Sequence, residues 1–121
     1  MLFAVVSDLH ANLQAWQMVL NDITAREADA IICLGDVVGY GPQPAAVMSS
    51  AYANVDHFVL GNHDAVVGRL MSAACFNDDA QRMIAWTADQ LDERAIDFFA
   101  GLPLVQAGPG FRCAHGMLPA P

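Results

Sequence analysis

The chain has no lysine, and its five arginines face 13 acidic residues, which gives a formal net charge of −8. The arginines are scattered along the sequence and form no basic cluster. A protein without a basic patch cannot displace the counterions of duplex nucleic acid, so that partner is excluded. An acidic protein that handles phosphate groups would need a metal ion to supply the missing positive charge.

Cysteine is also scarce, because Cys33, Cys75 and Cys113 are the only three and no two form a CxxC pair. Each has apolar neighbours, which favours reduced, buried thiols over disulfides or a zinc site. No apolar run approaches the roughly 20 residues of a membrane span. The first residues run directly into Ser7 and Asp8, without the basic region of a signal peptide. We therefore expect a cytoplasmic protein with no membrane partner.

Charged residues are few as well, at 15% of a chain of 121 residues that is 55% hydrophobic. A soluble domain of this size usually has about 25% charged residues. The high apolar fraction excludes intrinsic disorder, and the length fits one domain with a core of its own. Two explanations of the apolar excess stay open: a bias toward alanine, or a surface that something outside these residues normally covers.

Strands and helices alternate in the first half of the chain. Short apolar runs that are typical of strands buried on both faces of a sheet occur at residues 2–6, 30–34 and 57–60. Helices are expected between them, over 12–26 with Asn12 as the N-cap, and from Pro44 to about Tyr52. The alternation predicts an α/β fold, with a mainly parallel sheet flanked by helices and right-handed connections.

The second half of the chain is mainly helical. Three helices are expected, over residues 64–74, 77–91 and 92–101. Asn77 and Asp92 are placed to cap the second and the third of them. Two further strands, at 104–107 and 111–114, flank a Gly-Pro-Gly turn, which is typical of a hairpin.

Polar side chains that suit hard metal ions follow four of the predicted strands. They are Asp8 and His10 after the first strand, Asp36 after the second, Asn62, His63 and Asp64 after the third, and His115 after the last. Ligands bind beyond the carboxyl ends of strands in such sheets, so these groups are expected to meet at one edge. Carboxylate, imidazole and amide ligands together suit manganese, iron or zinc. One carboxylate can also bridge two ions that lie about 3.5–4 Å apart.

Each of these groups alone has an ordinary structural explanation. Asp8 could cap the helix that follows, Asp36 could be a turn residue, and His115 could be structural. Four such clusters at the ends of four separate strands would be an improbable accident, which favours a metal site. His57 opens a strand without such support and is interpreted as structural.

Four short motifs follow one another along the chain: Asp8-Leu9-His10, Gly35-Asp36-Val37-Val38-Gly39, Gly61-Asn62-His63-Asp64 and His115-Gly116. This set resembles the calcineurin-like metallophosphoesterase superfamily, in particular its small prokaryotic phosphoesterases. The resemblance implies the first half of an αββα sandwich. It also implies a hydrolase of phosphate mono- or diesters that uses two metal ions and a hydroxide bound to them. The substrate would be a small-molecule phosphate ester or a phosphoprotein, selected by loops such as 39–44 and 65–79.

The resemblance further implies a metal-binding role for five residues. Asp8 and His10 would bind the first ion, and Asn62 and His115 the second. Asp36 would bridge both ions. Manganese is the expected metal, with iron, zinc, nickel and magnesium as alternatives.

Two more residues would take part in catalysis. The resemblance implies that His63 stands near the leaving oxygen, as a proton donor or charge stabiliser, without binding metal. Asp64 would orient the imidazole of His63, since a carboxylate partner fixes the tautomer of a histidine.

The closing Gly-His-x-His motif of the superfamily has no counterpart here, because no histidine follows His115. We therefore expect residues 1–121 to be the N-terminal portion of a longer metallophosphoesterase domain, or a shortened copy, with both metal shells one ligand short. Such a half-sandwich would leave one face of its sheet uncovered and open to self-association. The alternative function is a non-catalytic module that binds metal or phosphate in protein interaction or regulation.

Overall fold

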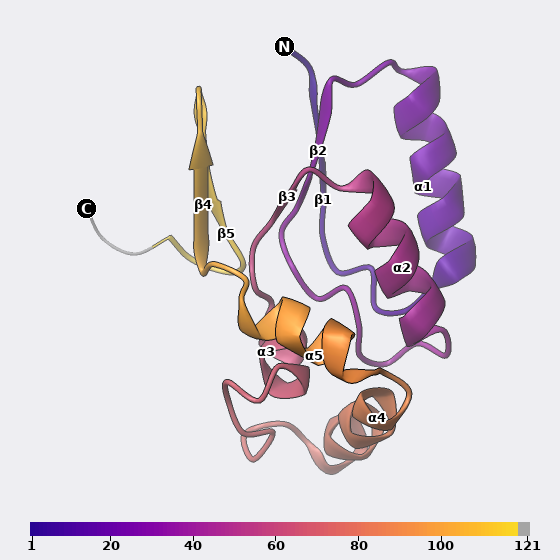
Figure 1. Cartoon of the computed structure of the whole chain (residues 1–121), viewed down its shortest axis with the longest axis vertical. Coiled ribbons are helices and arrows are strands. Elements are labelled where there is room, and N and C mark those ends of the chain that lie inside the picture. The colour runs from indigo at the N-terminus through magenta and orange to yellow at the C-terminus, as the bar shows by residue number, and fades with distance from the viewer. Residues whose placement is uncertain (119–121) are drawn as a thin grey trace.

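The computed structural model describes residues 1–118 (Figure 1). Its elements in chain order are β1 (Phe3–Val6), α1 (Leu13–Ala25), β2 (Ala30–Cys33), α2 (Pro44–Asn54), β3 (His57–Phe58), α3 (Asn62–Val67), α4 (Asp78–Asp89), α5 (Glu93–Ala100), β4 (Val105–Gly108) and β5 (Phe111–Ala114). None of the helices within these described residues is long and apolar enough to cross a membrane.

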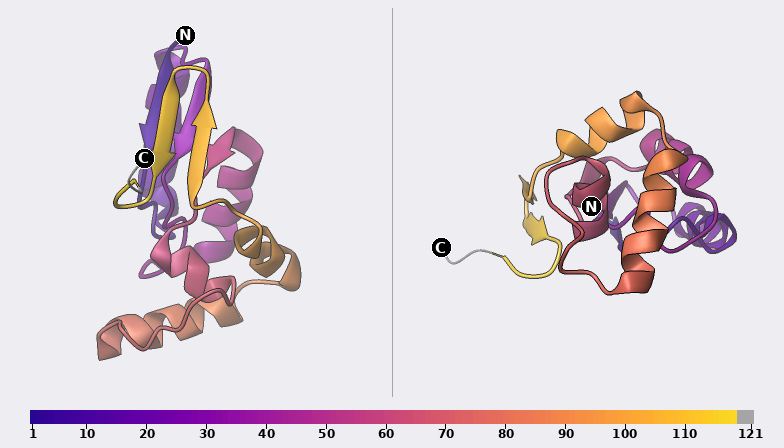
Figure 2. Two further views of the ribbon diagram at one scale, coloured as in Figure 1. Left: turned by 90° about the vertical axis from the view of Figure 1, so that its left-hand side faces the viewer. Right: turned by 90° about the horizontal axis from the view of Figure 1, so that it is seen from below.

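The first three strands form a parallel sheet in the order β1-β2-β3. Ala4 of β1 pairs with Ile31 of β2, and Cys33 of β2 pairs with Phe58 of β3. α1 and α2 cover one face of this sheet, and the antiparallel β4-β5 hairpin lies over the other (Figure 1 and Figure 2). The predicted α/β fold, with a parallel sheet flanked by helices, is confirmed.

Local signals set where the helices begin. The side chains of Asn12, Asn77 and Asp92 each accept a hydrogen bond from a backbone N–H three residues later, at the starts of α1, α4 and α5. Pro44 occupies the first turn of α2, where its missing N–H costs nothing. These N-termini agree with the sequence prediction to within about a residue, because a cap is a local feature.

Two elements are shorter than the sequence predicted. β3 contains only His57–Phe58, and the expected helix over 64–74 is the six-residue α3. Arg69, just after α3, has a φ of 61°, which ends the right-handed helical path. The helix also starts earlier than predicted, so that His63 belongs to its first turn.

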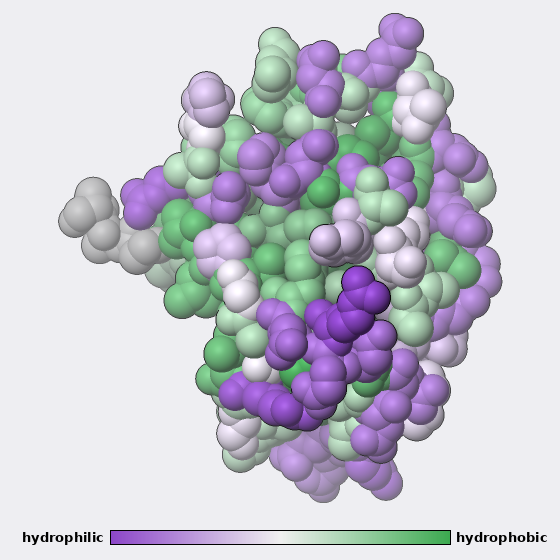
Figure 3. All heavy atoms as spheres, viewed as in Figure 1, coloured by the Kyte–Doolittle hydropathy of each residue, from purple (hydrophilic) through white to green (hydrophobic). Residues whose placement is uncertain are grey.

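The second face of the sheet is partly covered, whereas the sequence predicted an open face. The ring of Phe111 packs on those of Phe3 and His57, with centroids 5.1 and 5.4 Å apart. Ile32 of the central strand is buried. Val5 on the edge strand remains 59% exposed, so the expectation that β1 is buried on both faces is wrong there. Figure 3 shows hydrophobic surface between the hairpin and the sheet.

The three cysteines differ in burial. Cys33 is buried in the core and Cys113 is partly buried, but Cys75 is exposed. The expectation of three buried thiols is therefore wrong for Cys75. This residue lies in the irregular segment between α3 and α4, where the sequence predicted the end of a helix.

Candidate metal centre

The polar groups that follow four strands meet around the carboxylate of Asp36. Its Oδ2 lies 3.6 Å from Nε2 of His10 and 3.5 Å from Nε2 of His115. Oδ1 of Asp8 is 3.3 Å from Nε2 of His10, and Oδ1 of Asn62 is 3.1 Å from Nε2 of His115. The structure therefore brings together all five side chains that were expected to bind metal.

The loops that carry these residues have a strained backbone. Asp8, His10 and Asp36 have positive φ values of 58°, 45° and 56°. Backbone N–H groups of Asp8 and His10 donate hydrogen bonds of 2.9 Å to the carbonyls of Gly35 and Asp36, which holds the two loops side by side. Strain of this kind persists where the surrounding structure enforces it, and it clusters at functional sites.

His10 and His115 turn the same ring nitrogen toward the cluster. Nδ1 of His10 lies 3.1 Å from the carbonyl oxygen of Val38, and Nδ1 of His115 lies 2.7 Å from that of Leu34. A carbonyl oxygen can only accept, so each Nδ1 carries a proton and donates it. In the neutral ring, each Nε2 then directs a lone pair at the oxygens around Asp36. Oxygen and nitrogen lone pairs that face one another repel unless a proton or a metal ion lies between them.

This arrangement fits divalent metal ions. Histidines that bind metal typically donate their other ring N–H to a backbone carbonyl or a carboxylate, as both rings do here. Ligand atoms within 4.8 Å of one another form two sets, one from His10, Asp36 and His63 and one from Asp8, Asp36 and His115. Asp36 belongs to both sets, as a bridging ligand must. The sets divide Asp8 from His10, whereas the resemblance assigned both to one ion. Oδ1 of Asp8 nevertheless lies 3.3 Å from Nε2 of His10, so the geometry also allows these two to bind the same ion.

Asp64 is fully buried and ties the loops of the site together. Its carboxylate accepts hydrogen bonds from the backbone N–H groups of Asp36 at 2.8 Å, and of Val38 and Gly61 at 3.3 Å. Burial raises the pKa of Asp64 to about 7 and the charge of Asp36 adds to the rise, while these three donors oppose it. The expected contact with the imidazole of His63 is absent. Asp64 instead holds the loops together, because both of its carboxylate oxygens accept hydrogen bonds from their backbone N–H groups.

We expect Asp64→Ala to lower the free energy of unfolding by about 3 kcal/mol, since three buried N–H groups lose their acceptor. Asp64→Asn keeps one acceptor oxygen and should cost less than half as much. Urea denaturation of both variants beside the unmodified chain measures the two losses. An Asp64→Ala variant as stable as the unmodified chain would contradict this scaffolding role.

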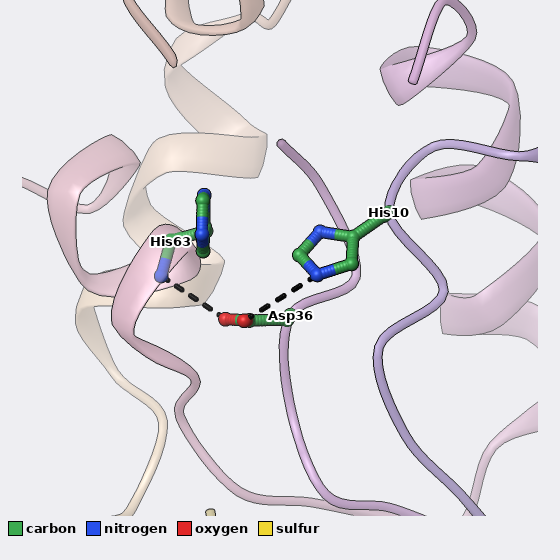
Figure 4. Close-up of side chains that lie close together, drawn as sticks. All are labelled: His10, Asp36 and His63. Carbon is green, nitrogen blue, oxygen red and sulfur yellow. Dashed lines mark hydrogen bonds and ion pairs between the residues drawn. The ribbon is translucent and has the colours of Figure 1, made fainter. Parts of the chain in front are cut away.

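Among the described residues, His63 is the histidine of the site whose ring makes no hydrogen bond. It is buried, and its backbone N–H donates to Oδ1 of Asp36 at 3.0 Å (Figure 4). Nδ1 has no hydrogen-bond partner among residues 1–118. Burial lowers the pKa of His63, against the opposing charge of Asp36, which favours the neutral ring. The free Nδ1 of His63 distinguishes it from His10 and His115, whose Nδ1 atoms are anchored on backbone carbonyls.

Gly39 leaves the space that the ring of His63 occupies. Its φ is 94°, and a Cβ atom at this position would lie 2.6 Å from Nδ1 of His63. We expect Gly39→Ala to displace the ring and to destabilise the fold by about 1–3 kcal/mol more than backbone strain alone. Gly110→Ala is the matched control, because Gly110 has a φ of 84° with no atom within 4 Å. Equal losses in thermal denaturation would show that His63 does not depend on this space.

Sequence reasoning missed two aromatic residues at the site. The ring of Tyr40 lies 4.7 Å from that of His63 and 5.0 Å from that of His10, measured between centroids. The ring of Phe76 lies 4.7 Å from that of His63. The two glycines around Tyr40 indicated a loop, but nothing in the sequence showed where its ring would point.

This chain is similar to known proteins in sequence and in fold. Residues 1–120 match the family model of the calcineurin-like phosphoesterases. An uncharacterized protein of Methanocaldococcus jannaschii is 38% identical over 104 residues, which are 86% of this chain and 43% of that protein. The crystal structure of a metallophosphoesterase from Sphaerobacter thermophilus is 35% identical with a TM-score of 0.74, over 89% of this chain and 44% of that one. A hypothetical protein from Pyrococcus horikoshii shares the fold, with a TM-score of 0.68 at 16% identity, over 87% of this chain and 49% of that one.

The chain spans less than half the length of each of these relatives. The four motifs on which the resemblance was based all lie within the residues of this chain that the family model matches. Because the family model matches nearly every residue, from Met1 to residue 120, the chain belongs to the calcineurin-like phosphoesterase family.

Proposed function

We propose that the chain acts as a metal-dependent hydrolase of phosphate mono- or diesters, with two divalent ions held around Asp36. The orientation of His10 and His115 carries this proposal. Both direct Nε2 at the same carboxylate oxygen, at 3.6 and 3.5 Å, and both anchor Nδ1 on a backbone carbonyl. The ligand atoms of the cluster thus direct their lone pairs at a common centre, where positively charged metal ions would stabilise them.

Two divalent ions would supply the charge that an attacking water and the phosphate oxygens require. We assign Asp8 and His10 to one ion, Asn62 and His115 to the other, and Asp36 to both. Manganese is our choice of metal, because mixed oxygen and imidazole ligands suit it. Backbone hydrogen bonds join the loops that carry these side chains and so keep the ligand atoms in place.

His63 stands beside this cluster, with its ring centroid 5.0 Å from that of His10. We propose that it faces the leaving group of the ester. As the P–O bond breaks, the electron pair stays on the leaving oxygen. The N–H of the neutral His63 ring stabilises that charge by a hydrogen bond, whereas transfer of a proton to the oxygen requires the imidazolium form of the ring.

The test is turnover of an aryl phosphate monoester and of the matching diester by the purified chain, with and without manganese. We expect release of the aryl alcohol that requires manganese and stops when EDTA is added. A chain that binds manganese but cleaves neither ester would favour the alternative function, a non-catalytic module that binds metal or phosphate. A chain that binds no manganese would contradict both.

We place this activity in the cytoplasm. Cys33, Cys75 and Cys113 are all free. Free thiols, one of them exposed, support a reducing compartment. The substrate class remains as the sequence predicts, a small-molecule phosphate ester or a phosphoprotein.

We also propose that the isolated chain self-associates through β1. This strand lies at the edge of the sheet, and a groove of about 690 Å³ beside it is lined by Val5, Trp16 and Val19 among others. An exposed apolar strand edge pairs readily with another chain. Light scattering should give a mass above that of one chain, and Val5→Lys should lower it, unlike Tyr52→Lys on α2. A monodisperse monomer would contradict this proposal.

A further inference from the structure

The imidazole of His63 is held without a hydrogen bond. Its Nδ1 has no partner among the described residues, and the nearby carboxylate of Asp64 is engaged by backbone donors. The ring is nevertheless buried. A group that must present an N–H to a substrate at a fixed angle needs some other restraint.

Two aromatic side chains contact the imidazole of His63 and can restrain it. The ring of Tyr40 lies 4.7 Å from the imidazole with an interplanar angle of 54°, and that of Phe76 lies 4.7 Å away at 35°. Tyr40 also contacts His10, edge to face, at 5.0 Å. Tilted and edge-on packing of this kind is favourable for aromatic rings and limits their rotation.

The loop that carries Tyr40 is built to hold the ring there. Tyr40 has a φ of 61°, a conformation that is uncommon for a bulky side chain. The backbone N–H of Gln43 donates to the carbonyl of Ala11, which fastens this loop to the one that carries His10. The side chain is 46% exposed, so burial alone does not explain why it takes this strained position.

We propose that Tyr40 and Phe76 are positioning residues, which hold the imidazole of His63 at the angle where its N–H meets the leaving oxygen. The proposal rests on the function proposed above for His63. It distinguishes two kinds of ester. An alkyl leaving group needs the N–H because its oxygen is strongly basic, whereas a nitrophenyl leaving group departs without help.

The first test reads the position of the ring directly, by NMR of the full chain. Gly39 lies against Nδ1 of His63, so a cross-peak between Hε1 of His63 and the α-protons of Gly39 reports the position of the imidazole. We expect Tyr40→Leu and Phe76→Leu to lose most of this cross-peak, and Tyr40→Phe to retain it. Tyr52→Leu is the control, because the ring of Tyr52 packs on Phe98 outside the site. An unchanged cross-peak in both leucine variants at the site would overturn the proposal.

The second test uses turnover of an alkyl phosphate and of 4-nitrophenyl phosphate with manganese. Tyr40→Leu and Phe76→Leu should lower kcat for the alkyl ester about 10- to 100-fold, with little change in KM and a much smaller loss for the nitrophenyl ester. Neither should lower kcat further when His63→Ala is already present. Equal losses on both esters, or losses that add to that of His63→Ala, would overturn the proposal.

The two tests separate the failure of this inference from the failure of the proposed function. If the unmodified chain cleaves neither ester, the role of His63 in catalysis fails. The cross-peak then still decides whether Tyr40 and Phe76 position the ring.

Discussion

Replacing Asp36 with asparagine should abolish two-metal occupancy and, with it, turnover. Oδ2 of Asp36 faces both His10 and His115, so this one side chain would serve both ions of the proposed centre. Oδ1 accepts the backbone N–H of His63 at 3.0 Å, and an asparagine can keep that hydrogen bond. Asparagine also tolerates the φ of 56° at this position. The variant therefore removes the bridging charge with little disturbance of the fold.

Elemental analysis of purified protein, after loading with manganese and removal of excess metal, counts the ions. Asp22→Asn is the matched control, because it removes the same charge from an exposed residue of α1 that pairs with Arg26. We expect two ions per chain in the control and at most one in Asp36→Asn. Two tightly bound ions in Asp36→Asn would show that this carboxylate is not the shared ligand.

His63→Ala should slow turnover by about 10²–10⁴-fold and leave metal binding nearly intact. The ring of His63 makes no hydrogen bond to the described residues of the site, and its proposed role is to stabilise the leaving group rather than to bind metal. Turnover of an alkyl phosphate, whose basic leaving oxygen needs the N–H, and the metal content of the same preparation are the two measurements.

The metal content is decisive for the role of His63, because His63 can form a set of ligand atoms with His10 and Asp36. Loss of an ion in His63→Ala would identify His63 as a ligand. His57→Ala is the control, since His57 contacts Phe111 away from the cluster and should alter neither quantity.

The sequence predicted those features that depend on neighbouring residues or on a general rule of topology. Asn12, Asn77 and Asp92 cap helices because capping involves residues three apart. Asp36 and His63, 27 positions apart, are joined by a hydrogen bond because the carboxyl ends of β2 and β3 share an edge of the parallel sheet. His115 approaches Asp36 to 3.5 Å from the separate β4-β5 hairpin, so the prediction that it shares this sheet edge is wrong.

Features that depend on long-range packing were not accessible from the pattern. The oxygens of Asp64 face backbone donors from two loops, and no spacing in the sequence distinguishes this from a contact with His63. Val5 lies in an apolar run that is typical of a buried strand, yet it is exposed because its strand lies at the edge of the sheet. The ring of Tyr40 reaches the site only because its loop adopts a strained backbone.

Manganese binding to the unmodified chain, followed by electron paramagnetic resonance, tests the central claim most directly. Two ions that share the carboxylate of Asp36 would lie about 3.5–4 Å apart, close enough for their electron spins to couple. We predict saturation at two manganese ions per chain, with the spectrum of a coupled pair. Saturation at one ion per chain, with the spectrum of an isolated ion, would contradict a dinuclear centre built around Asp36.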